Sequence, residues 1–263
     1  MEKMGRAFSV VVLAVSLLHA GKAETTQVGK GVQLFKAGKY DEAYRMLRPY
    51  AEAGDPRAQF TVGLLYDMGS IAMMDKARAV EWYRKAAEQG LADAQYDMGV
   101  MFSKGEGIYK DLGEARRWYE KAAAQGHPYA LYNLGVAWER GYGVQPDLNK
   151  AREYYEKAAA KGVAKAAYNL GNLYYKGKGV AKNVAEAARW YRKAAASGHP
   201  AAQFHLGWLY EHGEGVPRDP KEAKRWYREA AYNGSREGAW NYGLLLEKEG
   251  DPEAGYWKKR GKR

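Results

Sequence analysis

The amino-acid sequence predicts an all-α fold, an α/α superhelical solenoid of about six helix-turn-helix repeats of 36 residues. Three observations predict it. One glycine series recurs every 36 residues, at Gly63, Gly99, Gly135, Gly171, Gly207 and Gly243. A second glycine series keeps the same interval, at Gly54, Gly90, Gly126, Gly162, Gly198 and Gly234. Aromatic pairs also follow it, at Trp82–Tyr83, Trp118–Tyr119, Tyr154–Tyr155, Trp190–Tyr191 and Trp226–Tyr227. A fixed period between about 20 and 50 residues is the signature of stacked structural repeats.

The first helix of each repeat is predicted from its apolar spacing. Ala130, Leu134 and Trp138 are four residues apart, which places them on one face of a helix. Gly135 lies inside this helix, where a glycine costs roughly 0.5–1 kcal/mol relative to alanine. Such a glycine needs a packing reason, and we expect the second helix of the repeat to approach closely at this position.

A tight loop and a capped second helix follow. The loop has the pattern Gly-x-Gly-apolar, at residues 105–108, 141–144, 177–180 and 213–216, and its glycines permit positive φ. Asp111 with Glu114, Asn183 with Glu186 and Asp219 with Glu222 then have the spacing of a helix capping box. The second helix ends near a glycine such as Gly198, which suits a left-handed cap.

The N-terminal residues predict export. Lys3 and Arg6 precede an apolar run from Ala7 to Leu18, and small residues at Gly21 and Ala23 end the segment. This order of basic, apolar and small residues is typical of a secretory signal peptide cut after Ala23. We therefore expect residues 1–23 to be removed and the mature protein to be periplasmic or secreted.

The remaining boundaries follow from the repeats. The repeat domain is expected over residues 24–246. The last repeat would contain only its first helix, from Gly238 to Leu246, as a capping element, because end repeats must cover an exposed face. Residues 247–263 are expected to form a solvated basic tail, whose last six residues contain five of the basic residues behind the net charge of +11.

Composition limits the chemistry that the chain can perform. Cysteine is absent, which excludes a disulfide framework and a cysteine nucleophile. His205 and His212 are seven residues apart and have no third ligand in the pattern, so neither a metal site nor a cofactor is predicted. No serine begins Ser-x-x-Lys or lies in Gly-x-Ser-x-Gly, so no serine-nucleophile motif is present and we expect the protein not to be an enzyme.

The repeats resemble the Sel-one-like repeat (SLR) family, a longer-looped relative of the tetratricopeptide repeat. The residues that carry the resemblance are Ala94-Gln95-Tyr96-Asp97-Met98-Gly99, Gly213-Glu214-Gly215-Val216 and the run from Lys221 to Ala231 with its Trp226–Tyr227 pair. The resemblance covers about residues 58–246 and implies an α/α solenoid that assembles protein complexes. Residues 28–54 depart from it, because their shorter loop is closer to a plain tetratricopeptide repeat.

Two rows of polar residues on the first helices are the candidate binding site. The first row, in phase with the repeat, is Asp97, Asn133, Asn169, His205 and Asn241. The second row, seven residues or two helical turns further along, is Lys104, Arg140, Lys176 and His212, so both rows lie on one helix face. Asn172 and Trp208 lie between them. In solenoids the first helices are expected to line the concave surface, although a plain solvated face is the competing interpretation.

These rows predict the partner. Asparagine amides can pair with the backbone of an extended segment, and the basic row can hold carboxylates. We therefore expect a monomeric exported scaffold that binds an acidic or extended segment of a protein or peptide. The alternative is a binder of cell-wall or anionic polysaccharide, with the basic tail contacting anionic polymers or lipid. Some cysteine-rich members of the family have been discussed as β-lactam hydrolases, which is the least favoured function here. Nucleic acid is not an expected partner of an exported protein.

Overall fold

The computed structural model describes residues 26–69 and 74–262, and the predicted signal peptide lies outside them. All regular structure in these residues is α-helical, which confirms the predicted fold class. The chain divides into two compact units at His127–Pro128, and each unit is described by itself. None of the described helices combines the length and hydropathy that crossing a bilayer requires.

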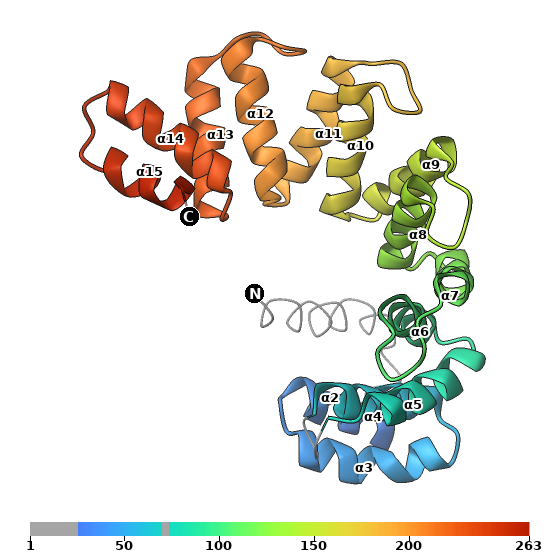
Figure 1. Cartoon of the computed structure of the whole chain (residues 1–263). Coiled ribbons are helices and arrows are strands. Elements are labelled where there is room, and N and C mark those ends of the chain that lie inside the picture. Colours follow the sequence, from blue (N-terminus) through green and yellow to red (C-terminus); the bar gives the residue numbers. More distant parts are fainter. Residues whose placement is uncertain (1–25, 70–73, 263) are drawn as a thin grey trace. The chain divides into compact units, whose positions relative to one another are not determined.

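Helices pair along the chain within each unit (Figure 1). Unit 1 contains α2 (Gln27–Lys36), α3 (Tyr40–Glu52), α4 (Pro56–Met68), α5 (Lys76–Glu88), α6 (Ala92–Lys104) and α7 (Leu112–Ala124). Unit 2 contains α8 (Pro128–Arg140), α9 (Leu148–Ala160), α10 (Ala164–Lys176), α11 (Val184–Ala196), α12 (Pro200–His212), α13 (Pro220–Tyr232), α14 (Arg236–Lys248) and α15 (Ala254–Lys262). Even-numbered helices are the first helices of the repeats, and odd-numbered helices are the second.

The N-caps predicted for the second helices form, but the capping boxes do not close, because the backbone N–H groups of Asp111, Asn183 and Asp219 donate to carbonyl oxygens of the first helices. The side chain of Asp111 accepts hydrogen bonds from the backbone N–H groups of Gly113 and Glu114, at 2.8 and 3.0 Å. Asp219 caps α13 in the same way, and Asn183 caps α11 by accepting from the backbone N–H of Glu186. Gly198 follows α11 with a φ of +77°, a left-handed conformation that glycine adopts without the steric penalty of a side chain.

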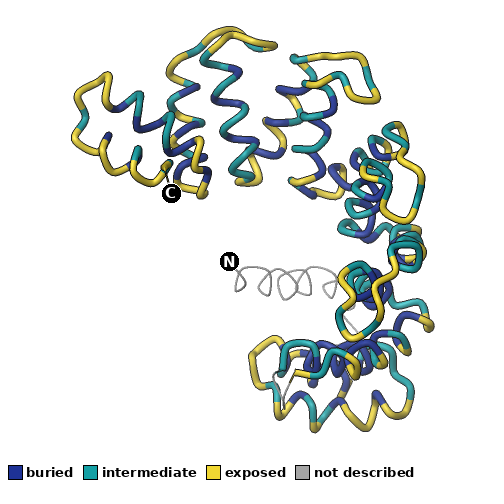
Figure 2. The backbone as a smooth tube through the Cα atoms, viewed as in Figure 1, coloured by how far each residue is buried: buried dark blue, intermediate teal, exposed yellow. Residues whose placement is uncertain are grey.

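A tyrosine of the second helix packs directly against the interior glycine of the first. A Cβ atom added to Gly135 would lie 2.5 Å from the ring of Tyr155, and Tyr155 is completely buried. The same contact joins Gly171 to Tyr191. This confirms the close approach expected from the glycine series, and Figure 2 shows the buried residues on the facing sides of the paired helices.

Each Gly-x-Gly loop contacts the repeat that precedes it. A Cβ added to Gly215 would lie 2.5 Å from the backbone carbon of Val184, at the start of the second helix of the preceding repeat. The loop therefore packs against the preceding helix pair along the chain as well as joining its own two helices. This close approach explains why the second glycine of the loop recurs.

The C-terminal segment corrects the sequence prediction. The expected solvated tail is instead helix α15, which packs against α14 and completes a seventh helix pair in the described part of the chain. Trp257 and Ala254 are buried in a cluster with Tyr242 and Leu246. The prediction that the last repeat has only one helix was wrong. It relied on the positive charges of residues 258–263 and overlooked Ala254 and Trp257, the two buried residues through which α15 packs.

Replacing Gly135 with alanine tests the packing of the repeat. The added methyl group would collide with Tyr155, and overpacking of this kind costs about 1–3 kcal/mol. We expect urea denaturation to show a loss of unfolding free energy in that range.

Gly255→Ala is the matched control, because an added Cβ at Gly255 has no neighbour within 4 Å. Alanine in this exposed helix should leave stability unchanged or raise it by up to ~1 kcal/mol. Equal effects of the two substitutions would contradict the packing account.

Candidate functional site

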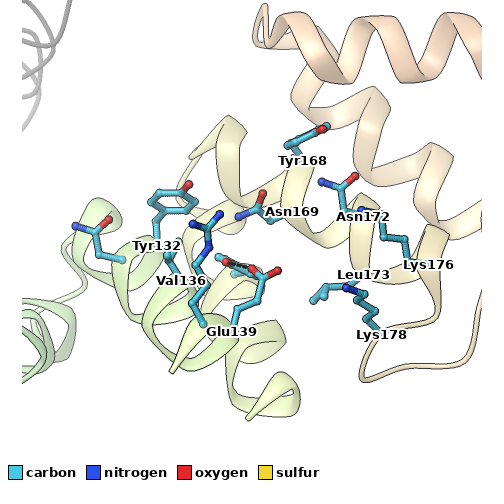
Figure 3. A pocket seen from close by; sticks show the side chains of 12 residues that line it. Tyr132, Val136, Glu139, Tyr168, Asn169, Asn172, Leu173, Lys176 and Lys178 are labelled. Atoms are coloured by element: carbon cyan, nitrogen blue, oxygen red, sulfur yellow. Dashed lines mark hydrogen bonds between the residues drawn. The ribbon is translucent and has the colours of Figure 1, made fainter. Parts of the chain in front are cut away.

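A polar cavity of about 480 Å³ opens in unit 2 between side chains of two successive first helices, α8 and α10. Figure 3 shows how these side chains gather from both helices. The lining residues are Tyr132, Asn133, Val136, Glu139, Arg140, Tyr155, Tyr168, Asn169, Asn172, Leu173, Lys176 and Lys178.

A hydrogen bond from the second helix holds the carboxylate of Glu139. The hydroxyl of Tyr155 donates to Glu139 Oε2 at 2.5 Å. Burial raises the pKa of Tyr155 well above its ordinary value, and the hydrogen bond with Glu139 raises it further. The hydroxyl therefore stays protonated and remains a donor. Because the tyrosine ring is held against Gly135, the packing of the two helices fixes the hydroxyl that binds Glu139.

Asn172 and Asn169 also contact tyrosine hydroxyls. Tyr191 donates to Asn172 Oδ1 at 2.8 Å, which leaves the two N–H donors of the Asn172 amide for other partners. The pKa values of Tyr132 and Tyr155 are raised mainly by burial, and a side-chain hydrogen bond with Asn169 opposes that rise in both. These amides are therefore held in place and do not form a freely solvated row.

Cations dominate the charge of the cavity. Arg140, Lys176 and Lys178 are exposed at its edge, and none of the three forms an ion pair with another described residue. Arg140 donates to the Tyr142 hydroxyl at 3.5 Å. With Glu139 as the one acid among the described lining residues, the formal charge is +2, which favours an anionic ligand.

The cavity brings together part of the site predicted from the sequence. Five predicted residues line it: Asn133, Arg140, Asn169, Asn172 and Lys176. Four of them come from the two polar rows, as two helical turns of separation implied, and Asn172 lies between the rows. That they bind a partner stays a prediction.

Aromatic rings occupy the corresponding positions one repeat further along. The ring of His205 stacks on Tyr191 and Tyr168, with centroids 5.2 and 5.8 Å apart. Trp208 stacks on His212 at 4.2 Å. The predicted residues His205 and Trp208 thus contact neighbouring aromatic rings, in contrast to the polar side chains of Asn169 and Asn172.

The other predicted residues lie elsewhere. Asn241 forms a hydrogen bond with Tyr227 that opposes the burial-driven rise in the pKa of that tyrosine. Asp97 and Lys104 belong to unit 1. Burial raises the pKa of Asp97, and the charges of Asp67 and Asp93 raise it further. Lys104 Nζ lies 3.7 Å from Glu106 Oε1.

We did not predict from the sequence that Glu139, Lys178 or the three tyrosines Tyr132, Tyr155 and Tyr168 line the cavity. A third in-phase row contained the first of them: Asp67, Ser103, Glu139, Tyr175 and Glu211. Tyrosines of the second helices donate from the same relative position to Ser103, Glu139 and Glu211. The periodicity of that row was available in the sequence, but its contact with the buried tyrosines was not.

The histidines form packing and turn contacts. His199 caps α12, accepting from Ala202 N at 3.2 Å, and buried His127 stacks on Tyr96. Among the described residues, no group of three or more His, Asp or Glu side chains could hold a metal ion.

Burial of His205 predicts a stability that depends on pH. Burial lowers the pKa of His205 below 6.5, and the charge of Lys176 lowers it further. The unfolded chain therefore binds this proton more readily, so stability should fall as the pH drops below 6.5. His199 has a shift of the same sign. We expect His205→Asn, which introduces the residue found at Asn169, to lose less stability than the wild type between about pH 7.5 and pH 5 in urea denaturation. Identical pH profiles would contradict this assignment.

Comparison with known proteins identifies the family. The Sel1 repeat model matches five consecutive segments, residues 56–91, 92–127, 128–163, 164–199 and 200–235. The crystal structure of a Sel1 repeat protein from Oxalobacter formigenes is 33% identical, with a TM-score of 0.84, over 89% of this chain and 98% of that one. A search of curated proteins found no match.

A second similar structure is longer than this chain. The protein c5321, a protective antigen of uropathogenic Escherichia coli strains with an SLR fold, is 34% identical with a TM-score of 0.83. The match covers 92% of this chain but 54% of c5321. The immunity protein Pa5087 from Pseudomonas aeruginosa, at 21% identity and a TM-score of 0.51, shares the fold. The extent of the family match and the identities above 30% show that this chain belongs to the Sel1 repeat family.

Proposed function

We propose that this protein is an exported scaffold that binds an acidic, extended peptide segment at the cavity between α8 and α10. The observation that carries the proposal is the convergence of five predicted residues, four from the two polar rows and Asn172 from between them, on one cavity of about 480 Å³. Sel1-repeat solenoids generally serve as scaffolds for protein–protein interactions and are typically non-catalytic. The peptide class and the location are specific to our proposal.

The chemistry of the cavity suits a peptide. An extended segment has backbone N–H and C=O groups without internal partners, and asparagine amides can satisfy both kinds of group. Arg140 can hold a carboxylate with two parallel hydrogen bonds, while Lys176 and Lys178 supply point charges. Val136 and Leu173 add an apolar floor beside these polar groups.

A binder of anionic polysaccharide is the second candidate, and helix α15 favours it. Lys258 pairs with Glu247, but Lys259 and Lys262 are exposed and have no ion pair with a described residue. Tyr256 is 56% exposed beside them. Cations beside an exposed aromatic ring can contact an anionic polymer, in a salt-dependent manner.

Export is proposed from the signal-peptide pattern of residues 1–23. We expect fractionation of its native cells to recover the protein in the periplasm or the medium. N-terminal sequencing of the recovered protein should begin at Glu24. An intact N-terminus at Met1 in the cytoplasm would contradict export while leaving the binding proposal in place.

A triple substitution tests peptide binding. Replacing Asn133, Asn169 and Arg140 with alanine removes two amides and one cation from the cavity. We expect at least tenfold weaker binding to acidic peptides on an array, with circular dichroism unchanged. The control replaces Glu153, Lys157 and Lys161 on and after α9, which do not line the cavity.

The wild type and the triple variant also distinguish polysaccharide binding from peptide binding. Unchanged peptide binding by the triple variant would reject the cavity as the site. Co-sedimentation with a purified anionic glycan that weakens with salt, together with absent peptide binding, would favour polysaccharide.

A further inference from the structure

Glu139 is an unexpected residue in this cavity. It is the one acid among the described lining residues, and it faces a cavity whose edge holds Arg140, Lys176 and Lys178. A site that only attracted anions would gain affinity from a neutral residue here, because a carboxylate repels an anionic ligand. Figure 3 shows Glu139 among the side chains that line the cavity.

The structure positions Glu139 as a hydrogen-bond acceptor. Its Oε2 accepts from Tyr155, and that tyrosine is fixed by burial and by its contact with Gly135. Glu139 forms no ion pair with the described basic residues, and its Oε1 has no donor among the described residues. The carboxylate is therefore held in a fixed place with acceptor capacity unused.

Asn172 supplies a hydrogen-bond donor in the same cavity. Because its Oδ1 accepts from Tyr191, its amide nitrogen can donate to a ligand. Together with the cations of Arg140, Lys176 and Lys178, it provides donors for an anion, while Glu139 provides an acceptor. The cavity is thus complementary to a ligand that carries an anionic group and a hydrogen-bond donor close together.

We infer that Glu139 makes the cavity selective for a peptide carboxylate with a neighbouring backbone N–H, which donates to Glu139 while the carboxylate binds the donors of Asn172 and the cations. This inference rests on the proposed peptide-binding function and names the group that is recognised. An acidic side chain and a C-terminal carboxylate both have a backbone N–H within the same residue. The internal units of a polyphosphate chain carry charge without such a donor, so Glu139 disfavours them.

The test uses defined peptide pools and a matched pair of variants. The pools are N-acetylated octapeptides, randomised except for one central aspartate, and made with a free or an amidated C-terminus. A second set has that aspartate N-methylated, which keeps its carboxylate and removes its N–H. Glu139→Gln retains an acceptor for the Tyr155 hydroxyl. Glu211→Gln is the control, because Glu211 accepts from Tyr227 in the same way but does not line the cavity.

We expect Glu139→Gln to weaken binding of the aspartate pool about tenfold, since hydrogen bonds to charged groups contribute more than neutral ones. N-methylation should weaken wild-type binding by a similar factor and have little further effect on Glu139→Gln, as two changes that remove one interaction are not additive. Glu211→Gln should bind like the wild type. Comparison of amidated and free-acid pools shows whether the carboxylate belongs to a side chain or to the chain end.

Failure of this inference and failure of the proposed function give different results. If Glu139→Gln binds the aspartate pool as tightly as the wild type, or more tightly, Glu139 does not accept from the ligand and the inference is wrong, although peptide binding stands. If the full-length wild-type protein binds the pools no better than the Asn133, Asn169 and Arg140 triple variant does, the proposed function fails as well.

Discussion

The contact between a glycine of the first helix and a tyrosine of the second is the constraint on which the rest of the structure depends. At Gly135 there is no room for a Cβ beside the Tyr155 ring, so the two helices meet with the ring filling the space between them. The contact also directs the hydroxyl of Tyr155 toward Glu139 on the first helix. A residue needed for packing thereby becomes a support for the polar side chains of the candidate site.

Repetition gives each pair of first helices the same framework, and side-chain identity decides what it holds. Between α8 and α10, Asn169, Asn172 and Lys176 line a polar cavity. At the corresponding positions of α12, His205, Trp208 and His212 contact neighbouring aromatic groups. One backbone geometry can therefore present different surfaces along the same chain, because the core residues repeat while the first-helix positions vary.

Periodicity predicted the framework well, since glycine and aromatic positions follow directly from close helix packing. It predicted the helices α8 to α13 and the N-cap residues of α11 and α13, and it placed Asn169 and Lys176 on one face. It could not predict α15, where Trp257 and Ala254 supply the apolar contacts within a strongly basic segment. Nor could it predict the role of Glu139, because the hydrogen bond from Tyr155 depends on how far the two helices approach. The divergence of His205 from Asn169 likewise depends on contacts with Tyr168 and Tyr191 from other helices.

The most direct test of the central claim is site-specific photo-crosslinking from the cavity in native cells. A benzophenone amino acid at Val136, in the cavity wall, should crosslink a partner protein through a segment that contains a carboxylate, as identified by mass spectrometry. The same group at Ala160, exposed at the end of α9, should not capture that segment. Crosslinks from Val136 that match those from Ala160, or that map to segments without acidic residues or a chain end, would contradict the account.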